Sequence, residues 1–101
     1  MEIVLWTNNA CSKSRTAEQI LTEHGIPFTK RYYEQDPPTR RELEEVLRKI
    51  GTDDPHAIAR PGVVGDVLGQ LTKDPSLIER PIAIKGDRAV VARPPEKVLD
   101  L

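Results

Sequence analysis

The stretch EIVLWTNNACSKSRTAEQILTEHGIPFTKRYYE (residues 2–34) decides the fold of this protein. It opens with an apolar, β-rich run at residues 2–7, which predicts a buried strand. Apolar residues at helical spacing then predict a helix over about 12–24, and Gly25 supplies its C-terminal cap. A second strand is predicted over 28–34. A helix between two strands is typical of a βαβ unit, whose two strands are parallel.

Helices are expected in the middle of the chain. The sequence TRRE (residues 39–42) has the spacing of a capping box, and the apolar residues after it predict a helix that ends at Gly51. Residues 52–78 are interrupted by prolines and glycines, so two or three short helical pieces are expected there rather than one long element.

The last quarter of the chain predicts a hairpin and a short helix. Two β-rich runs, 81–85 and 88–92, flank a two-residue turn of the primed kind at Gly86 and Asp87. A short helix is expected to begin at PPE (residues 94–96) and to run to residue 101. The predicted fold is therefore α/β, with the order βαβ, helical insert, ββα, and a mixed sheet of about four strands covered by helices.

Size and charge exclude several classes of protein. The chain has 101 residues and a net charge of -1, with charges of both signs mixed along it. One domain with its own core is expected. The absence of a basic face argues against a nucleic-acid binder, and the absence of a long apolar segment argues against a membrane protein. A cytoplasmic monomer without a metal site is expected, since one cysteine and the distant His24 and His56 lack ligand spacing.

The only cysteine, Cys11, directly precedes the first predicted helix, with Lys13 and Arg15 beside it. A helix N-terminus and nearby cations stabilise a thiolate, which is the reactive form of cysteine. The same N–H groups can hold a small tetrahedral oxyanion over the sulfur. The alternative is that Cys11 is only a small buried apolar residue.

Two known cysteine motifs do not fit this loop. A phosphatase loop needs an arginine six positions after the cysteine, where Ala17 stands, and a dithiol motif needs a second cysteine where Ser14 stands. A monothiol enzyme or sensor remains. Any oxidised state of Cys11 must then be resolved by a thiol from another molecule.

Three Arg-Pro dipeptides stand at 60–61, 80–81 and 93–94. An arginine fork suits oxyanions, and the proline after it restricts the local backbone. Solvated surface arginines are the alternative interpretation. Pro81 begins a strand, a position where a cis peptide bond can occur.

Several separated motifs resemble the glutaredoxin-coupled arsenate reductases of the thioredoxin fold, the ArsC family. They are NNACSKSR (8–15), DPPTR with EL (36–43), ERPI (79–82) and RPPEKVL (93–99). The resemblance covers nearly the whole chain. It implies a single thioredoxin-like domain over residues 1–101, with a shortened helical insert around 52–79.

The resemblance also implies the roles of individual residues. Cys11 matches the catalytic nucleophile, and the three arginines that hold the oxyanion and its thiol adducts are Arg60, Arg80 and Arg93. Pro81 is expected to be cis and to face the cysteine. The other groups expected to help bind the oxyanion are Ser12, Lys13, Ser14 and Arg15, with Asn8 in a supporting position.

The implied reaction is the reduction of arsenate to arsenite through a covalent adduct on Cys11. An external thiol such as glutathione resolves the adduct, and glutaredoxin removes the resulting mixed disulfide. No bound cofactor is needed. The expected partners are arsenate, a low-molecular-weight thiol and a glutaredoxin-like protein.

The sequence departs from the family pattern at two places. Where family members usually carry a histidine or other polar group before Asn-Pro, this loop reads TNN (residues 7–9), so Lys13 and Arg15 are expected to contribute more to thiolate stabilisation. The segment between Arg60 and Arg80 is shorter than usual, which predicts a more open site and weaker activity.

Two other functions stay open. One is a redox-sensing transcription regulator of the same fold that binds RNA polymerase, although such regulators typically sense through a cysteine pair, which Ser14 removes. The other is a monothiol reductase of a different small electrophile that reacts with Cys11.

Overall fold

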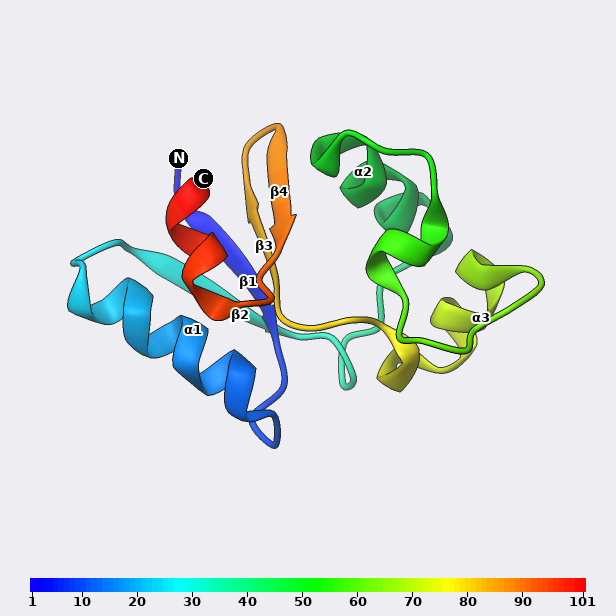
Figure 1. Cartoon of the computed structure of the whole chain (residues 1–101), viewed down its shortest axis with the longest axis horizontal. Coiled ribbons are helices and arrows are strands. Elements are labelled where there is room, and N and C mark those ends of the chain that lie inside the picture. Colours follow the sequence, from blue (N-terminus) through cyan, green and yellow to red (C-terminus); the bar gives the residue numbers. More distant parts are fainter.

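The computed structural model describes all residues, 1–101, as a sheet flanked by helices (Figure 1). None of its helices combines the length and the apolar composition needed to cross a membrane. Three of its helical elements, labelled η, are 3-10 helices. In chain order the elements are β1 (Ile3–Thr7), α1 (Ser12–Glu23), β2 (Phe28–Tyr32), α2 (Arg40–Ile50), η1 (Pro55–Ile58), α3 (Val67–Lys73), η2 (Pro75–Leu77), β3 (Ile82–Lys85), β4 (Arg88–Val91) and η3 (Pro95–Asp100).

The sheet has four strands in the order β2-β1-β3-β4. β1 runs parallel to β2, whereas β3 is antiparallel to both of its neighbours, β1 and β4. In the register, Leu5 of β1 lies opposite Lys30 of β2 on one side and Ala83 of β3 on the other. The predicted α/β fold with a four-stranded mixed sheet is confirmed.

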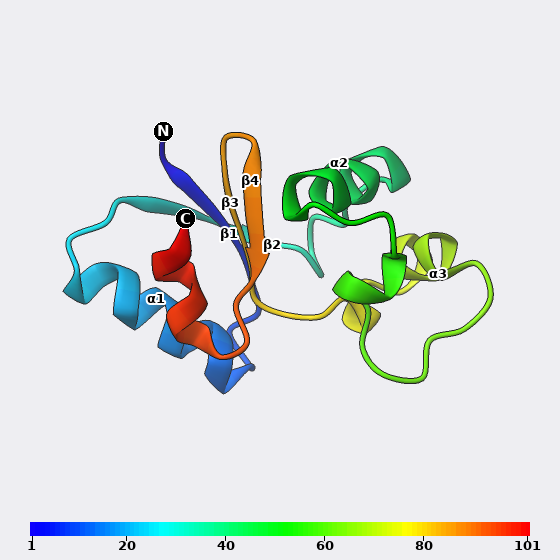
Figure 2. The same ribbon diagram turned by 45° about the horizontal axis from the view of Figure 1, so that its top comes forward.

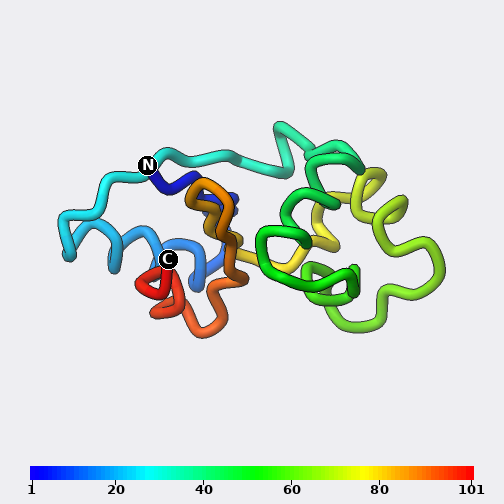
Figure 3. The backbone as a smooth tube through the Cα atoms, turned by 90° about the horizontal axis from the view of Figure 1, so that it is seen from above, coloured from blue at the N-terminus to red at the C-terminus, as the bar shows by residue number.

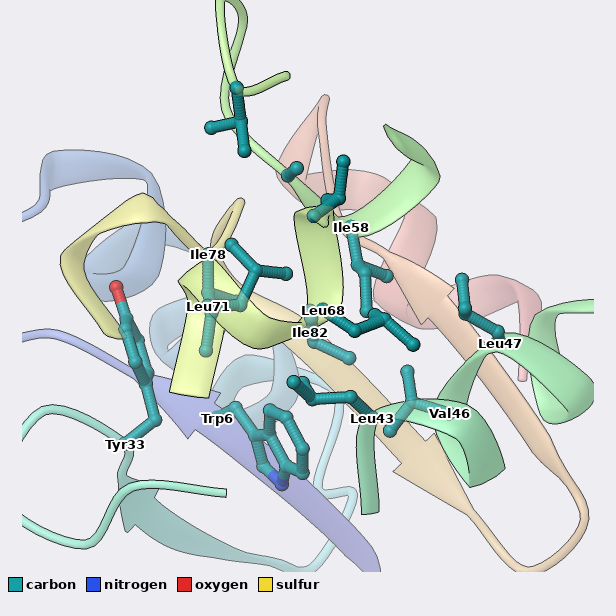
Figure 4. Close-up of a cluster of buried hydrophobic side chains, with 13 residues drawn as sticks. Trp6, Tyr33, Leu43, Val46, Leu47, Ile58, Leu68, Leu71, Ile78 and Ile82 are labelled. Atoms are coloured by element: carbon teal, nitrogen blue, oxygen red, sulfur yellow. The ribbon is translucent and has the colours of Figure 1, made fainter. Parts of the chain in front are cut away.

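Helices cover both faces of the sheet (Figures 1 and 3). Alternate residues of β1 supply both faces, because successive side chains of a strand point in opposite directions. One apolar cluster fills the space between one face of the sheet and the helices α1 and η3. It consists of Ile3, Leu5, Ala17, Leu21, Ala83, Ala92 and Val98. On the other face Trp6 packs under the helical half of the molecule, which comprises α2, η1, α3 and η2 (Figure 4). The sheet therefore separates two apolar clusters.

The predicted capping box starts α2. Thr39 Oγ1 accepts a hydrogen bond from the Glu42 N–H at 3.1 Å, and a Glu42 carboxylate oxygen accepts one from the Thr39 N–H at 3.0 Å. Gly51 ends the helix with a φ of +97°, in the left-handed region that favours glycine. The inward face of α2 carries Leu43, Val46 and Leu47.

The proline-rich middle of the chain forms three short helical pieces, η1, α3 and η2, as predicted. An antiparallel bridge between Ala59 and Ile78 joins its two ends. The Arg60 N–H donates to the Leu77 carbonyl at 2.8 Å, and the Glu79 N–H donates to the Ile58 carbonyl at 2.8 Å. Figure 2 shows the chain returning from this region to β3. The bridge thus brings Arg60 close to the segment that leads into Arg80.

One predicted boundary was wrong. The second strand ends at Tyr32 rather than at residue 34, because the N–H groups of Gln35 and Asp36 both donate to the Tyr32 carbonyl and form a turn. The predicted short C-terminal helix is present, as a 3-10 helix over Pro95–Asp100. In the hairpin, Gly86 has a φ of +58°, whereas Asp87 has a negative φ. A positive φ at the first of the two turn residues fits the predicted turn of the primed kind.

Candidate active site

Cys11 is the N-cap residue of α1, directly after β1. Its N–H donates to the Asn8 carbonyl at 2.9 Å, and the Asn8 side-chain oxygen accepts from the Ala10 N–H at 2.9 Å. The Asn8 N–H donates to Ser14 Oγ at 3.3 Å, and Ser14 is fully buried. Asn8 and Ser14 therefore shape the loop that presents the sulfur.

The pKa of the Cys11 thiol is lowered from its ordinary value of 9.0 to about 7. Partial burial acts against the thiolate, but it is outweighed by the Ser14 N–H, the Arg80 side chain, the Lys13 N–H and the Ser14 hydroxyl. Two N–H groups at a helix start and one guanidinium thus favour the charged sulfur. The thiolate is therefore much more populated near neutral pH than it would be for an ordinary cysteine.

The loop cations do not take the place that the sequence predicted for them. Lys13 acts on the sulfur through its backbone N–H, while its side chain is exposed. Arg15 is also exposed and donates to the Asn9 carbonyl at 3.0 Å. The cation that reaches the sulfur is Arg80, from the other end of the sequence. Ser12 occupies the first turn of α1 with an exposed side chain.

Arg80 stands where the helical half rejoins the sheet, and its peptide bond to Pro81 is cis. Pro81 is buried, and its carbonyl accepts from the Ala92 N–H at 2.8 Å, so it extends the pairing of β3 with β4. The cis bond agrees with the expectation from the resemblance. The bond between Arg93 and Pro94 is also cis, which the sequence did not predict.

A pocket of about 490 Å³ lies beside this loop. Arg60 and Arg80 both line it, and the Asn8 carboxamide donates to the Glu34 carboxylate at 2.5 Å on its wall. Arg60 and Glu34 are exposed, so the pocket opens directly to solvent. The full set of lining residues is Asn8, Glu34, Arg60, Pro61, Ser76, Leu77 and Arg80. Two of the three expected arginines therefore share one pocket.

Arg93 does not line this pocket. Its Nη1 donates to the Glu79 carboxylate and to the Arg80 carbonyl, both at 3.1 Å. Arg93 is thus held behind the backbone of Arg80 by Glu79, whose pairing with Arg93 the sequence did not indicate. Its direct contact with an oxyanion stays a prediction.

Tyr33 is a second residue that the sequence analysis missed. It is fully buried, and its hydroxyl lies in the electrostatic surroundings of Arg80 and Cys11, next to the Asn8 carboxamide. A signal was present in the sequence. An aromatic residue with a polar tip, placed directly after a strand of a parallel pair, stands at the edge where the other strand delivers Cys11.

The arrangement suits attack by sulfur on a small oxyanion. It supplies a partly ionised nucleophile, free N–H groups at a helix start and guanidinium groups from two separate segments. No group of three or more histidine, cysteine, aspartate or glutamate side chains is placed to hold a metal ion.

The ArsC family model matches residues 6–101, nearly the whole chain. The protein belongs to the ArsC family. An arsenate reductase of Haemophilus influenzae is 30% identical to this ArsC chain over 115 aligned positions, which cover 100% of the chain and 99% of the relative. Because the chain has only 101 residues, the relative carries residues without a counterpart here.

Solved structures share the fold of this ArsC chain. An arsenate reductase from Vibrio cholerae superimposes with a TM-score of 0.89 and 29% identity, covering 99% of this chain and 97% of the other. The thioredoxin-like α/β fold is thereby confirmed. A global transcriptional regulator, Spx 1 of Oceanobacillus iheyensis, is 31% identical over 102 positions, which cover 88% of this chain and 78% of the regulator. Proteins similar to this ArsC chain therefore include both enzymes and a regulator.

Proposed function

We propose that this protein reduces arsenate to arsenite with Cys11 as its nucleophile and with electrons from external thiols. The observation that carries the proposal is the ionisable Cys11 sulfur at the start of α1, beside Arg80, in a chain similar over its whole length to arsenate reductases. Arsenate is a tetrahedral oxyanion, which helix N–H groups and arginine forks bind well.

In the first step the Cys11 thiolate attacks arsenic. An arsenic–sulfur bond forms and an arsenic–oxygen bond breaks, and the oxygen leaves as water after taking up protons. Arg80 and Arg60 offset the negative charge of the oxyanion, and Arg93 holds the Arg80 backbone in place. The N–H groups of Lys13 and Ser14 stabilise Cys11 again when it departs as thiolate.

In the second step an external thiol replaces an oxygen on arsenic, which leaves as water. A second external thiol then attacks the sulfur of the first, so that a sulfur–sulfur bond forms, the sulfur–arsenic bond breaks and its electron pair stays on arsenic. Water finally displaces the Cys11 thiolate from arsenic. The two electrons come from thiols, which end as a disulfide, while arsenic goes from the +5 to the +3 state and leaves as arsenite. Cys11 is the only cysteine, so no internal disulfide can form. We propose glutathione with glutaredoxin as this donor pair, in the cytoplasm, where reduced thiols are available.

The test is arsenate-dependent NADPH oxidation, coupled through glutathione, glutaredoxin and glutathione reductase. Wild-type protein should turn over, and Cys11→Ser should not. The NADPH oxidation caused by the coupling enzymes alone is measured with Cys11→Ser in place of the wild type. Turnover with another small thiol but not with glutathione would support the arsenate reductase activity and show that the electron donor is a different thiol. Folded protein that is inactive with every thiol tested would contradict the proposal.

A second candidate is a regulator that binds RNA polymerase, favoured by the similarity to Spx 1. Its test is association of the full chain with the isolated polymerase α-subunit, together with the absence of arsenate turnover. Ser14, fully buried where a second cysteine would stand, removes the dithiol through which such a regulator would sense oxidation. A reductase of another small electrophile would instead show turnover with that electrophile and none with arsenate.

A further inference from the structure

Two buried polar atoms in this protein have no hydrogen-bond partner within 3.5 Å, the Tyr33 hydroxyl and Nε of Arg80. The Asn8 carboxamide lies near the hydroxyl and the Cys11 thiol near the guanidinium, but neither comes within that distance of the unpaired atom. Folded proteins pair nearly all of their buried polar groups, so an unpaired one often marks a functional site. Here the two atoms belong to neighbouring residues of one site, because the Arg80 charge acts directly on the Tyr33 hydroxyl. Their coincidence calls for one common explanation.

The Tyr33 ring is held so that its hydroxyl faces the active-site side. The residue follows β2 in the turn formed by the N–H groups of Gln35 and Asp36. Figure 4 shows the ring at the margin of the apolar cluster, with the oxygen at the end remote from Trp6. Cys11 and the Asn8 carboxamide are among the groups that affect the pKa of this hydroxyl.

Both unpaired atoms are hydrogen-bond donors. Nε of an arginine can only donate, and a neutral tyrosine hydroxyl carries a proton of its own. If Arg80 donated to the Tyr33 oxygen, the tyrosine proton would still lack an acceptor. A single acceptor placed between the two residues would satisfy both donors. An oxygen of a tetrahedral anion held over Cys11 is such an acceptor.

We propose that the Tyr33 hydroxyl is an oxyanion-binding group, which donates a hydrogen bond to the same anion that Arg80 binds beside the Cys11 sulfur. This inference rests on the proposed function, in which an oxyanion occupies that place. It adds a neutral donor, from the end of β2, to the arginines and the helix N–H groups already described.

The protonation state of Tyr33 agrees with this role. Burial raises the pKa of the Tyr33 hydroxyl above its ordinary value, and the charge of Arg80 only partly offsets that effect. The hydroxyl therefore keeps its proton throughout the neutral range and can donate. An ionised tyrosine would instead repel an anion.

Access to the hydroxyl requires a side chain to move. Both unpaired atoms are shielded from solvent, and the Asn8 carboxamide beside Tyr33 is tied to Glu34 on the pocket wall. Tyr33 does not line the pocket, so an anion held there beside Arg80 reaches the hydroxyl once the Asn8 side chain turns aside. Binding and rearrangement of the site are thus coupled.

The test compares Tyr33→Phe with Tyr32→Phe, which removes a hydroxyl from the neighbouring residue in β2. The probes are phosphate and sulfate, and the readout is how far each anion slows the alkylation of Cys11 by iodoacetamide. Tyr33→Phe should raise the half-protecting anion concentration about tenfold or more, as expected for loss of a hydrogen bond to a charged group. Tyr32→Phe should behave like the wild type.

Thermal unfolding provides the second readout. The Tyr33 hydroxyl has no partner in the free protein, so Tyr33→Phe should unfold at the wild-type temperature or higher. Unchanged anion protection in Tyr33→Phe would overturn the proposal, as would a wild type that neither anion protects. A lower unfolding temperature without loss of protection would assign the hydroxyl a purely structural role and overturn it too.

The alkylation experiment and the coupled turnover assay together separate this inference from the proposed function. Wild-type protein that is protected by the anions but does not turn over arsenate would refute the reductase. In that case weaker protection of Tyr33→Phe would still establish the oxyanion-binding group.

Discussion

Arg93 donates one hydrogen bond of 3.1 Å to the Glu79 carboxylate and another of 3.1 Å to the carbonyl of Arg80. The ion pair with Glu79 is largely shielded, since the side chain of Glu79 is only 19% exposed. The Arg80 guanidinium in turn lowers the pKa of the Cys11 thiol. Arg80 thus acts on the sulfur, whereas Arg93 acts one step further away, on the backbone of Arg80.

This difference predicts separable effects of Arg80→Ala and Arg93→Ala. Both should lower kcat/KM for arsenate, by about 100-fold for Arg80→Ala, as for removal of an oxyanion donor. Only Arg80→Ala should raise the pKa of Cys11 toward its ordinary value, because only Arg80 reaches the sulfur. Arg40→Ala is the control, since Arg40 pairs with Asp66 on the surface. An equal loss of activity in Arg40→Ala would contradict the assignment of both arginines.

The pH dependence of Cys11 follows from its lowered pKa. The alkylation rate should rise with a midpoint near pH 7 instead of 9, because the thiolate is the species that reacts. An acid whose folded-state pKa is lowered stabilises the fold above its unfolded pKa and loses that contribution as the pH falls through the folded value. Wild-type protein should therefore lose stability relative to Cys11→Ser between about pH 9 and 7. Rates that titrate at the ordinary thiol pKa would refute the activation of Cys11.

Arg60 should affect binding more than chemistry. It is exposed and lines the pocket with Arg80, without acting on the sulfur. Arg60→Ala is expected to raise KM for arsenate about tenfold, with a smaller change in kcat and an unchanged Cys11 pKa. Arg88→Ala, on the hairpin, serves as the matched control. A selective fall in kcat would place Arg60 in the chemical step instead.

Thr39→Ala tests the cap of α2. Loss of the Thr39 side chain removes one half of the capping box, and the free energy of unfolding should fall by about 1 kcal/mol. Thr22→Ala is the control, because the Thr22 hydroxyl only donates to the Glu18 carbonyl within α1. Urea denaturation compares the two variants. Equal stability would show that the cap contributes nothing to the fold.

Most elements could be predicted from the sequence because their signals are local. Helical spacing gave α1, and the capping box with Gly51 gave both ends of α2. The end of β2 was missed because Tyr33 continues a β-prone run, while the turn depends on two N–H groups that donate to the same carbonyl. Backbone pairing of that kind leaves no pattern in the side chains.

The site was less predictable than the fold. A motif can indicate that Arg93 matters, but the direction of its side chain depends on Glu79, which lies in a different motif of the same sequence. Similarly, sequence proximity favoured Lys13 and Arg15 as the cations beside Cys11, whereas the return of the chain into β3 places Arg80 there. Contacts between distant segments decide the electrostatics of this site.

The position of Trp6 gives the protein a built-in optical probe. Trp6 is the only tryptophan, is nearly fully buried on the sheet face that the helical half covers, and lies 5.0 Å beneath the Arg31 guanidinium. Indole fluorescence responds to polarity and to nearby charge. Its emission should therefore change when the helical half, which carries Arg60, detaches from the sheet. Changes confined to the α1 face of the sheet should leave the emission unaltered.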